Sequence, residues 1–565
     1  MENIYNAIQN VYNMDKTTWQ EVLAELYNLV YKVENKFDLF ETKFGQLLGE
    51  ELTIKLKKMY DDGSLAALIN DKLLKEVSEK LDNNTNELKK IKTFEIFPSD
   101  EELINLNLDE TFEVKGFYVE GDINKCLYKK VSYSQNALQK NGFCIKPITN
   151  CSNKKIYLPF IGIKEGKENS EKNSTILSNL SLAFGTTLEL PDGHFYFKNT
   201  IDLKSKQCSL KGNYITFTSD LNTGGITFLH FEELKEGEKA ITLATGGLSN
   251  IVVVGNKEDY NYNINREQTY INPQSIENEI CNKKITGIYG GSTTTLENVY
   301  VKNFYKGCYL ESGNIYINNF FARNCHYGLS IGNDTKCMGV FGFDVHTLLQ
   351  IRGSISSAVQ VRGDSVHHLV NICGGNTSGV HLTALDGDFC VGSVLTIGEH
   401  DVWGTVSNLV INGITGRFCA YNAYDKSVDE VPTSNNITDS SDISNWAFIS
   451  VYQKNNLDGA YITTSTSLSS NLMDKASNYY TPPILMAGGA NCKIIACINT
   501  MYGSYYATDG SIKINRELLL NTFKFFSSNT NNTRIAINTP SNVYYYHKPN
   551  PNTINITRGV TESLS

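Results

Sequence analysis

The stretch Leu296-Glu-Asn-Val-Tyr-Val-Lys-Asn-Phe-Tyr-Lys-Gly-Cys-Tyr-Leu310 is followed by a second version of itself, Ile317-Asn-Asn-Phe-Phe-Ala-Arg-Asn-Cys-His-Tyr-Gly-Leu-Ser-Ile331. Apolar, asparagine and glycine positions of the two stretches match at a constant offset of 21 residues. A solenoid requires such equal spacing, because each coil buries its apolar positions only against the next coil. Asparagine suits the tight turns between strands, because it tolerates the left-handed conformation. The repeat therefore predicts a parallel β-helix, and its fixed period argues against the competing interpretation, an antiparallel sandwich.

Similar apolar runs at 247–255, 358–363 and 378–382 look like further coils, so we expect the β-helix to cover residues 171–430. A polar, turn-rich stretch begins at Val431, and strand-like runs resume at Trp446. Residues 431–565 are therefore expected to form a β-rich C-terminal domain.

The first ninety residues contain no proline and show apolar residues at alternating spacings of 3 and 4. Such a seam runs from Leu23 to Leu47 and again from Leu74 to Ile91. It predicts a helical coiled-coil stem over residues 1–93, although a single amphipathic helix packed on a globular body remains an alternative. The number of strands in the coiled coil does not follow from the seam.

Residues 94–170 are predicted to form a small β-rich shoulder. Apolar and polar residues alternate over 112–122 and 126–131, and shorter runs at 143–148 and 156–160 predict further strands. The polar segment 166–174 is predicted to be a loop, followed by a capping helix over 175–184.

Three segments resemble one family. The Asp62-Gly-Ser-Leu-Ala-Ala-Leu-Ile-Asn turn and helix resembles the N-terminal region of appendage and tail proteins of short-tailed phages of Gram-positive bacteria. The string Lys115-Gly-Phe-Tyr resembles the cap of the same proteins, and Gly185-Thr-Thr-Leu-Glu-Leu-Pro-Asp-Gly-His-Phe-Tyr-Phe resembles the entry of pectate-lyase-like tailspike β-helices. One departure is the segment 168–174, where an acidic string of the family is degenerate.

The resemblance implies a mainly β homotrimer with a right-handed, single-stranded β-helix. It also implies a virion appendage or tailspike that docks on phage neck, tail or collar proteins through its stem. The implied partner is a bacterial surface glycopolymer, teichoic acid or capsule, which some members of the family degrade. Two alternatives remain open: a receptor-binding fibre without activity, and a bacterial polysaccharide lyase or hydrolase.

Charge, cysteine spacing and hydropathy argue against several other classes of protein. The formal charge is −9 and no basic stripe occurs, so nucleic acid is not an expected partner. The thirteen cysteines form no metal-ligand spacing, so we expect reduced core residues, no metal and no cofactor. The segment Met1-Glu-Asn lacks the features of a signal peptide, and no apolar run reaches membrane-spanning length. These features fit a virion protein that is made in the host cytoplasm, does not insert into membranes and acts outside the host cell. They fit an ordinary cytosolic protein as well.

Glycosidic cleavage needs two carboxylates a few ångströms apart, and the later coils hold the candidates. Asp386 and Asp388 form the tightest acidic pair, and Glu399 belongs to the densest titratable cluster. Asp364 precedes Asp386 by 22 residues, about one coil, so the two are predicted to lie side by side on one outer face. Acidic residues are also common in β-helix turns, where they bond backbone N–H groups without any catalytic role.

Aromatic and basic residues are candidates for sugar binding. These are Trp403, Arg362, Tyr505 and Tyr545. Tyrosines equally suit a β-core or a subunit contact, so this assignment competes with a structural one. If the substrate is teichoic acid, the reaction is phosphodiester hydrolysis, for which Arg352, Arg362 and Arg417 are at hand.

Overall fold

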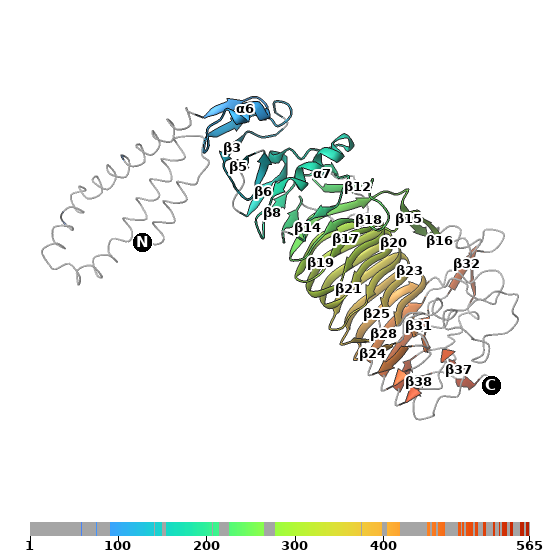
Figure 1. The fold of residues 1–565 in the computed structure, drawn as a ribbon. Helices are drawn as coiled ribbons and strands as arrows, with labels where there is room; N and C mark the ends of the chain where they lie inside the picture. Colours follow the sequence, from blue (N-terminus) through green and yellow to red (C-terminus); the bar gives the residue numbers. More distant parts are fainter. Residues whose placement is uncertain are drawn as a thin grey trace. The chain divides into compact units, whose positions relative to one another are not determined.

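A computed structural model describes most of residues 91–418 (Figure 1). The described ranges are 91–121, 123–140, 142–149, 154–205, 207–213, 225–264, 277–373, 376–397 and 404–418, with strand segments between 449 and 563 and the single residues Lys58 and Lys75. The chain divides into two compact units, residues 1–92 and 93–565. The stem predicted over residues 1–93 lies almost entirely outside the described residues.

The second unit begins with a six-stranded sheet in the order β1-β2-β3-β5-β4-β7. Its strands are β1 (Lys92–Phe94), β2 (Thr111–Val114), β3 (Cys126–Val131), β4 (Ala137–Lys140), β5 (Phe143–Pro147) and β7 (Leu180–Ser181). The short helix α6 (Asp100–Ile104) starts at a capping box, in which Ser99 and Glu102 satisfy each other's backbone N–H groups. The strands predicted near 112, 126 and 143 are confirmed.

The entry to the solenoid differs from the prediction. Residues 167–169 form a 3-10 turn and α7 spans Ser170–Ser178, so the predicted loop over 166–174 is wrong. Four of its polar residues, Asn169, Ser170, Asn173 and Ser174, are buried, and the side chains of Asn173 and Ser174 bond backbone groups of neighbouring segments. Asn173 bonds both backbone groups of Lys164, and Ser174 accepts the N–H of Lys198. Composition alone does not distinguish such buried bonding residues from solvated loop residues.

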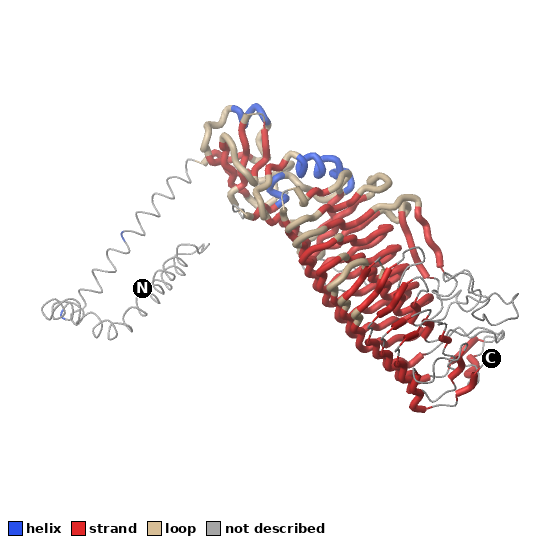
Figure 2. The backbone as a smooth tube through the Cα atoms, turned by 60° about the horizontal axis from the view of Figure 1, so that its bottom comes forward, coloured by secondary structure: helices blue, strands red, loops and turns tan. Residues whose placement is uncertain are grey.

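The solenoid is a stack of parallel coils (Figure 2). Its longest strands are β18 (Thr294–Leu310), β19 (Ser312–Ile331), β20 (Asn333–Ile351), β21 (Ser357–Ile372), β23 (His381–Ile397) and β25 (Val410–Phe418). Each pairs in parallel with the next, and Leu296 lies opposite Ile317 as the 21-residue repeat predicts. The structure therefore confirms a mainly β chain with a long parallel sheet and excludes the antiparallel sandwich for the described coils.

Two left-handed corners divide each of these coils into a first, a middle and a third segment. The first corner holds Asn250, Asn298, Asn319, Gly339, Gln360, Ala384 and Gly413, all with positive φ. The second corner holds Asn303, Asn324, Asp344 and Ser365. At the first corner, Asn319 Nδ2 donates to Asn298 Oδ1 over 3.0 Å. The repeated asparagines thus serve both the turn conformation and the bonding between coils.

The core of the solenoid consists of the inward positions of all three segments. Val299, Phe320 and Val340 stack in register and have no exposed surface. Among the nine cysteines whose side chains the structure describes, eight are buried and only Cys281 is exposed, and all nine are free. This agrees with the prediction of reduced core cysteines.

Shorter strands complete the early coils, and a hairpin projects from them. The early strands are β6 (Lys155–Tyr157), β8 (Thr187–Glu189), β9 (Gly193–Tyr196), β10 (Ile201–Asp202), β11 (Ser209–Lys211), β12 (Thr227–Phe231), β13 (Lys239–Thr242), β14 (Gly246–Gly255) and β17 (Thr286–Gly290). The strand predicted at 156–160 is thus β6, followed by the 3-10 turn η1 (Leu158–Ile161). The antiparallel hairpin β15 (Tyr260–Ile264) and β16 (Glu277–Cys281) contacts β18 to β20.

Parallel pairing continues past residue 430, where the sequence suggested a separate domain. The later strands of the main sheet are β26 (Ile449–Val451), β28 (Tyr461–Leu468), β29 (Ile484–Met486), β31 (Lys493–Thr500), β34 (Lys524–Phe525), β36 (Arg534–Asn538) and β38 (Ile554–Arg558). A parallel five-stranded sheet runs beside it, with β22 (Asn376–Ser378), β24 (Gly404–Ser407), β27 (Asn455–Asp458), β30 (Gly489–Ala490) and β35 (Thr530–Asn531).

Candidate functional site

The outward positions of the middle segments of β20, β21 and β23 form a regular array. Phe341, Arg362 and Asp386 follow one another across the three strands. Two residues further along the strands, Phe343, Asp364 and Asp388 do the same. We call the outer surface at these six positions the acidic face. Because neighbouring parallel strands lie about 4.8 Å apart, the array brings the predicted acids together on a rigid support.

The register corrects the predicted neighbour of Asp364. Paired positions in β21 and β23 are 24 residues apart, as with Val361 and Leu385, and not about 22. Asp364 therefore lies beside Asp388, and Arg362 lies beside Asp386. The longer spacing arises because the turn between the two strands holds β22 (Asn376–Ser378). Asp364 and Asp386 still share one outer face, as diagonal neighbours.

This arrangement offers two spacings between carboxylate positions. Directly opposite positions, such as 364 and 388, have Cβ atoms about 5 Å apart, and diagonal ones, such as 364 and 386, about 7–8 Å apart. Retaining glycosidases hold their carboxyl groups about 5–5.5 Å apart, and inverting ones about 6.5–9.5 Å. The backbone register therefore makes these positions candidates for a pair of catalytic carboxylates.

The charges on the acidic face are partly paired. Arg362 Nε lies 3.5 Å from Asp386 Oδ2, and the two side chains are 62% and 43% exposed. Ser365 Oγ donates to Asp364 Oδ1 over 3.3 Å. An ion pair this exposed contributes little to stability. Arg417 in β25 is opposite Asp388 in the register, so the backbone brings a second arginine to the edge of the array.

Aromatic rings border the acids on the other side. Phe341 and Phe343 are half-buried, and the guanidinium carbon of Arg323 lies 4.9 Å from the centre of the Phe343 ring. Still earlier along the same outer face, Val252 and Tyr300 belong to an apolar cluster that is separate from the main core. The sequence interpretation missed these rings, although the repeat with strand alternation places positions 341 and 343 on the outside.

The other predicted site residues are not brought to the acidic face in the described structure. Glu399 and Trp403 lie outside the described residues. Tyr505 is in β32 (Gly503–Tyr506), which pairs with β33 (Ile512–Asn515), and Tyr545 is in β37 (Val543–Tyr545), which pairs with β39 (Thr561–Ser563). Both therefore belong to small sheets outside the main one, and their sugar-binding role stays a prediction.

Arg352 has a structural role instead. Its guanidinium donates to Ser330 Oγ and Tyr309 Oη, each over 2.7 Å, and to the carbonyl of Leu310. These partners lie on the third segments, around the corner from the acidic face. Arg352 thus ties neighbouring coils together, and its predicted availability for a phosphate is not supported.

The histidines near the acidic face form a separate column on the third segments. His326 and His346 stack with ring centroids 4.2 Å apart, and His346 stacks on His367 at 4.7 Å. Burial, followed by the neighbouring histidines, holds the pKa of His346 well below its usual value, and the pKa of His368 is lowered for the same reasons. No group of three or more His, Cys, Asp or Glu side chains suited to a metal ion occurs among the described residues.

Comparison with known proteins gives structural likeness only. No family model and no curated protein matches the sequence. The enzymatically active domain of tailspike protein 2 of bacteriophage CBA120 matches with a TM-score of 0.46 and 12% identity, over 80% of this chain and 64% of that one. A tailspike protein of Acinetobacter baumannii bacteriophage Fri1, a capsular polysaccharide depolymerase, matches with a TM-score of 0.29 and 13% identity, over 85% and 74% of the two chains.

A third structure is the A-module of a mannuronan C-5 epimerase of Azotobacter vinelandii, with a TM-score of 0.32 and 10% identity over 72% of this chain and 99% of that one. The chain thus spans less than two thirds of the CBA120 tailspike domain. None of the described helices is both long enough and apolar enough to cross a bilayer. The description of the fold therefore rests on the strand register of this chain.

Proposed function

We propose that this chain is the subunit of a phage virion appendage or tailspike that binds a bacterial surface glycopolymer during adsorption and cleaves it at the acidic face. The observation that carries the proposal is the register that places Asp364 beside Asp388 and Arg362 beside Asp386. The sequence resemblance over parts of residues 48–215 supplies the phage context. A homotrimer attached to the virion through residues 1–93 belongs to the same proposal.

A solenoid face suits an extended polymer because both are periodic. The outward positions of successive coils repeat about every 4.8 Å, so one chain of sugars or polyol phosphates meets several coils at once. Phe341 and Phe343 offer half-exposed ring faces to the apolar sides of sugar rings. Arg362 and the carboxylates offer hydrogen bonds to sugar hydroxyl groups. If the polymer is teichoic acid, the guanidinium of Arg362 also offers a positive charge to its phosphates.

Cleavage needs one carboxyl group that gives a proton to the leaving oxygen and a second one that acts as base or nucleophile. We assign these roles to Asp364 and Asp388, because they are direct neighbours in the register. Asp386 is assigned to binding instead, because it lies opposite Arg362 and forms an ion pair with it.

The test combines a cleavage assay with a cell-binding assay. Purified full-length protein is incubated with capsule or wall teichoic acid from candidate hosts, and released fragments are detected by mass spectrometry. The double variant Asp364→Asn, Asp388→Asn should release no fragments. The matched control Glu297→Gln removes an exposed acid from a first segment, on a different face of the solenoid, and should release fragments as the wild type does.

The outcome separates the alternatives. Cell binding without any fragments from the wild type would leave a receptor-binding fibre and contradict cleavage. Unchanged release by the double variant would contradict the assignment of the site. Cleavage of a polysaccharide without binding to cells would favour a bacterial lyase or hydrolase.

A further inference from the structure

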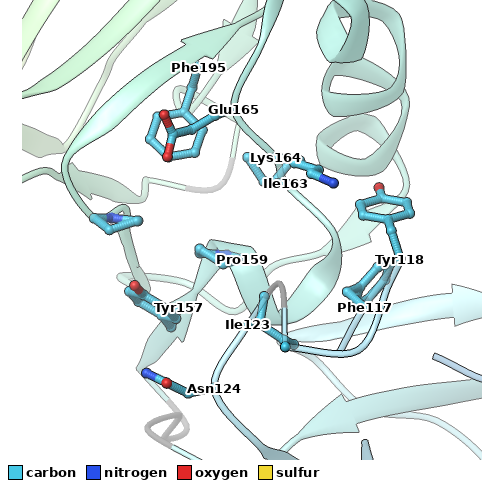
Figure 3. Close-up of a pocket in the computed structure, with 12 residues that line it drawn as sticks. Phe117, Tyr118, Ile123, Asn124, Tyr157, Pro159, Ile163, Lys164, Glu165 and Phe195 are labelled. Carbon is cyan, nitrogen blue, oxygen red and sulfur yellow. The ribbon is translucent and has the colours of Figure 1, made fainter. Parts of the chain in front are cut away.

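A cleft of about 270 Å³ lies between the first coil of the solenoid and the part of the chain that forms the six-stranded sheet, which we call the cap (Figure 3). One wall comes from the cap segment 117–124, and the other comes from segments 157–165 and 191–195. The polar and aromatic side chains that line the cleft include Phe117, Tyr118, Asn124, Tyr157, Lys164 and Glu165. The acidic face has no part in this cleft, since none of its six residues lines it.

Two of the sequence motifs singled out above meet at this place. The string Lys115-Gly-Phe-Tyr supplies the rings of Phe117 and Tyr118, and the string Leu190-Pro-Asp-Gly-His-Phe supplies Pro191 and Phe195. Neither motif takes part in the function proposed so far. Residues of both strings therefore line the same cleft.

Two glycines position the walls. Gly162 has a φ of +96°, and a Cβ there would lie 2.5 Å from the ring of Phe117. Gly193 has a φ of +132°, and a Cβ there would lie 2.3 Å from the Glu165 carboxyl carbon. Any side chain at either position would therefore displace a wall of the cleft, apart from the strain of the backbone conformation.

Hydrogen bonds hold the same two walls. Tyr118 Oη donates to the carbonyl of Gly162 over 2.6 Å, which fixes the ring. The N–H of His194 donates to Glu165 Oε2 over 3.2 Å. In the described structure, the other carboxylate oxygen of Glu165 is given no hydrogen bond by a protein group. Glu165 thus enters the cleft with one oxygen anchored and one available to a ligand.

The lining indicates the chemistry of the ligand. Rings and prolines provide flat apolar walls, while Glu165, Asn124 and the Tyr157 hydroxyl provide hydrogen-bonding groups. Lys164 contributes one positive charge, which Glu165 offsets, so a net ionic charge is not favoured. Flat apolar surfaces together with hydroxyl-binding groups match a sugar ring, which has apolar faces and a rim of hydroxyls. The volume is slightly below the roughly 300 Å³ at which small-molecule pockets usually begin, which suits one or two rings.

We propose that this cleft is a second carbohydrate site, which holds a neutral pyranose unit by means of Glu165 and the surrounding rings. The choice of a sugar over another neutral polyol rests on the proposed function. A second site, separated from the acidic face by several coils, would keep a polymer attached between successive cleavages. Binding of the single sugar is independent of cleavage, so the two proposals fail separately.

The experiment uses full-length protein and three probes. Methyl α-D-glucopyranoside and N-acetyl-D-glucosamine are the neutral probes, and glycerol 3-phosphate is the anionic comparator, all titrated by saturation-transfer NMR. We expect the wild type to bind at least one neutral sugar, and Glu165→Ala to weaken that binding about tenfold through the lost charged hydrogen bond. Ile123→Trp, which fills the cleft from its cap side, should abolish it.

The matched control is Glu171→Ala, which removes an exposed acid of α7 that does not line the cleft. This control should bind the neutral probes as the wild type does. Thermal unfolding checks that Ile123→Trp is folded. If Ile123→Trp does not fold, Glu165→Ala still tests the site. No binding of either neutral sugar, unchanged binding by Glu165→Ala, or tighter binding of glycerol 3-phosphate would each overturn the proposal. Neutral-sugar binding by a protein that cleaves no polymer would leave this site standing and contradict the proposed reaction.

Discussion

The imidazole ring of His326 lies flat against that of His346, with centroids 4.2 Å apart and planes 6° apart. His367 continues the column on one side and Tyr305 on the other. The hairpin β15–β16 packs on this column, where Tyr262 meets the edge of His346 and Glu279 bonds His326 Nδ1 over 2.8 Å. Glu279 thus holds the hairpin against one end of the column.

We predict that acid destabilises the protein through three histidines: His346 in this column, His368 beside it, and His230 in β12. Burial and neighbouring histidines lower the pKa of His346 and His368, and burial followed by His194 lowers that of His230 to about 3. The unfolded chain, with histidine pKa values of about 6.5, then binds more protons than the folded one. This stabilisation is complete above about pH 6.5 and is lost as the pH falls below it. The midpoint temperature of thermal unfolding should therefore decrease when the pH is lowered from about 7.5 to about 5.

His346→Phe provides the control, because it keeps a flat ring in the column and removes one titrating group. The variant should show a smaller decrease of the midpoint temperature over the same pH range. Part of the decrease should remain, because His230 and His368 are still present. A midpoint that does not depend on pH, or a drop of equal size in the variant, would contradict the assignment to the column.

The asparagine corners predict a second effect on stability. Asn319 has a φ of 54° and donates to Asn298 Oδ1. Asn319→Ala should lower the free energy of unfolding by about 2–3 kcal/mol. It removes one hydrogen bond, and alanine has no polar side chain that could bond the local backbone in the left-handed region. Asn319→Gly should cost less, because glycine adopts this conformation freely, as Gly339 does in the next coil. Denaturant midpoints of the two variants measure the difference, and equal midpoints would contradict this explanation.

The coils were predictable because their causes are local and periodic. Inward positions such as Leu296 and Ile317 recur at the period of one coil, and the asparagines mark its corners. The capping helix was predicted too late, at 175–184 and not at Ser170–Ser178, because Asn173 and Ser174 bond to segments that are distant in sequence. Such partners are fixed only when the chain is folded, so a polar stretch alone does not reveal them.

The candidate site was only partly predictable for a similar reason. Strand alternation placed Asp364, Asp386 and Asp388 on one outer face. Their pairing depends on the length of the turn that holds Asn376–Ser378, and turn lengths vary without changing the core pattern. The hairpin over the histidine column was also not foreseen, because its contacts join residues such as Ile264 and Asp344, 80 positions apart.

Phe343 should contribute to polymer binding. Phe343→Ala removes a half-exposed ring beside Asp364 and should weaken binding about 3–10-fold, seen as a higher KM with little change in kcat. The matched control is Phe184→Ala, since Phe184 is 68% exposed and does not belong to the acidic face. Equal affinity of the two variants for the polymer would show that the ring of Phe343 does not contact it.

Arg362 should matter for function and not for stability. Its exposed ion pair with Asp386 is worth at most about 0.5–1 kcal/mol, so Arg362→Ala should unfold within a few degrees of the wild type. Polymer affinity should fall in the same variant, more for a polyol-phosphate chain than for a neutral polysaccharide, because only the former offers phosphates to a guanidinium. Affinity measured at low and high salt checks this, and a large loss of stability would indicate a structural residue instead.

The acidic face itself is tested most directly by a crystal structure of the Asp364→Asn, Asp388→Asn variant soaked with oligomers of the host glycopolymer. The predicted result is density for at least two units along the middle segments of β20 to β23, between Phe343 and Asp386. Density confined to another face of the solenoid, with none over these residues, would contradict the proposed site.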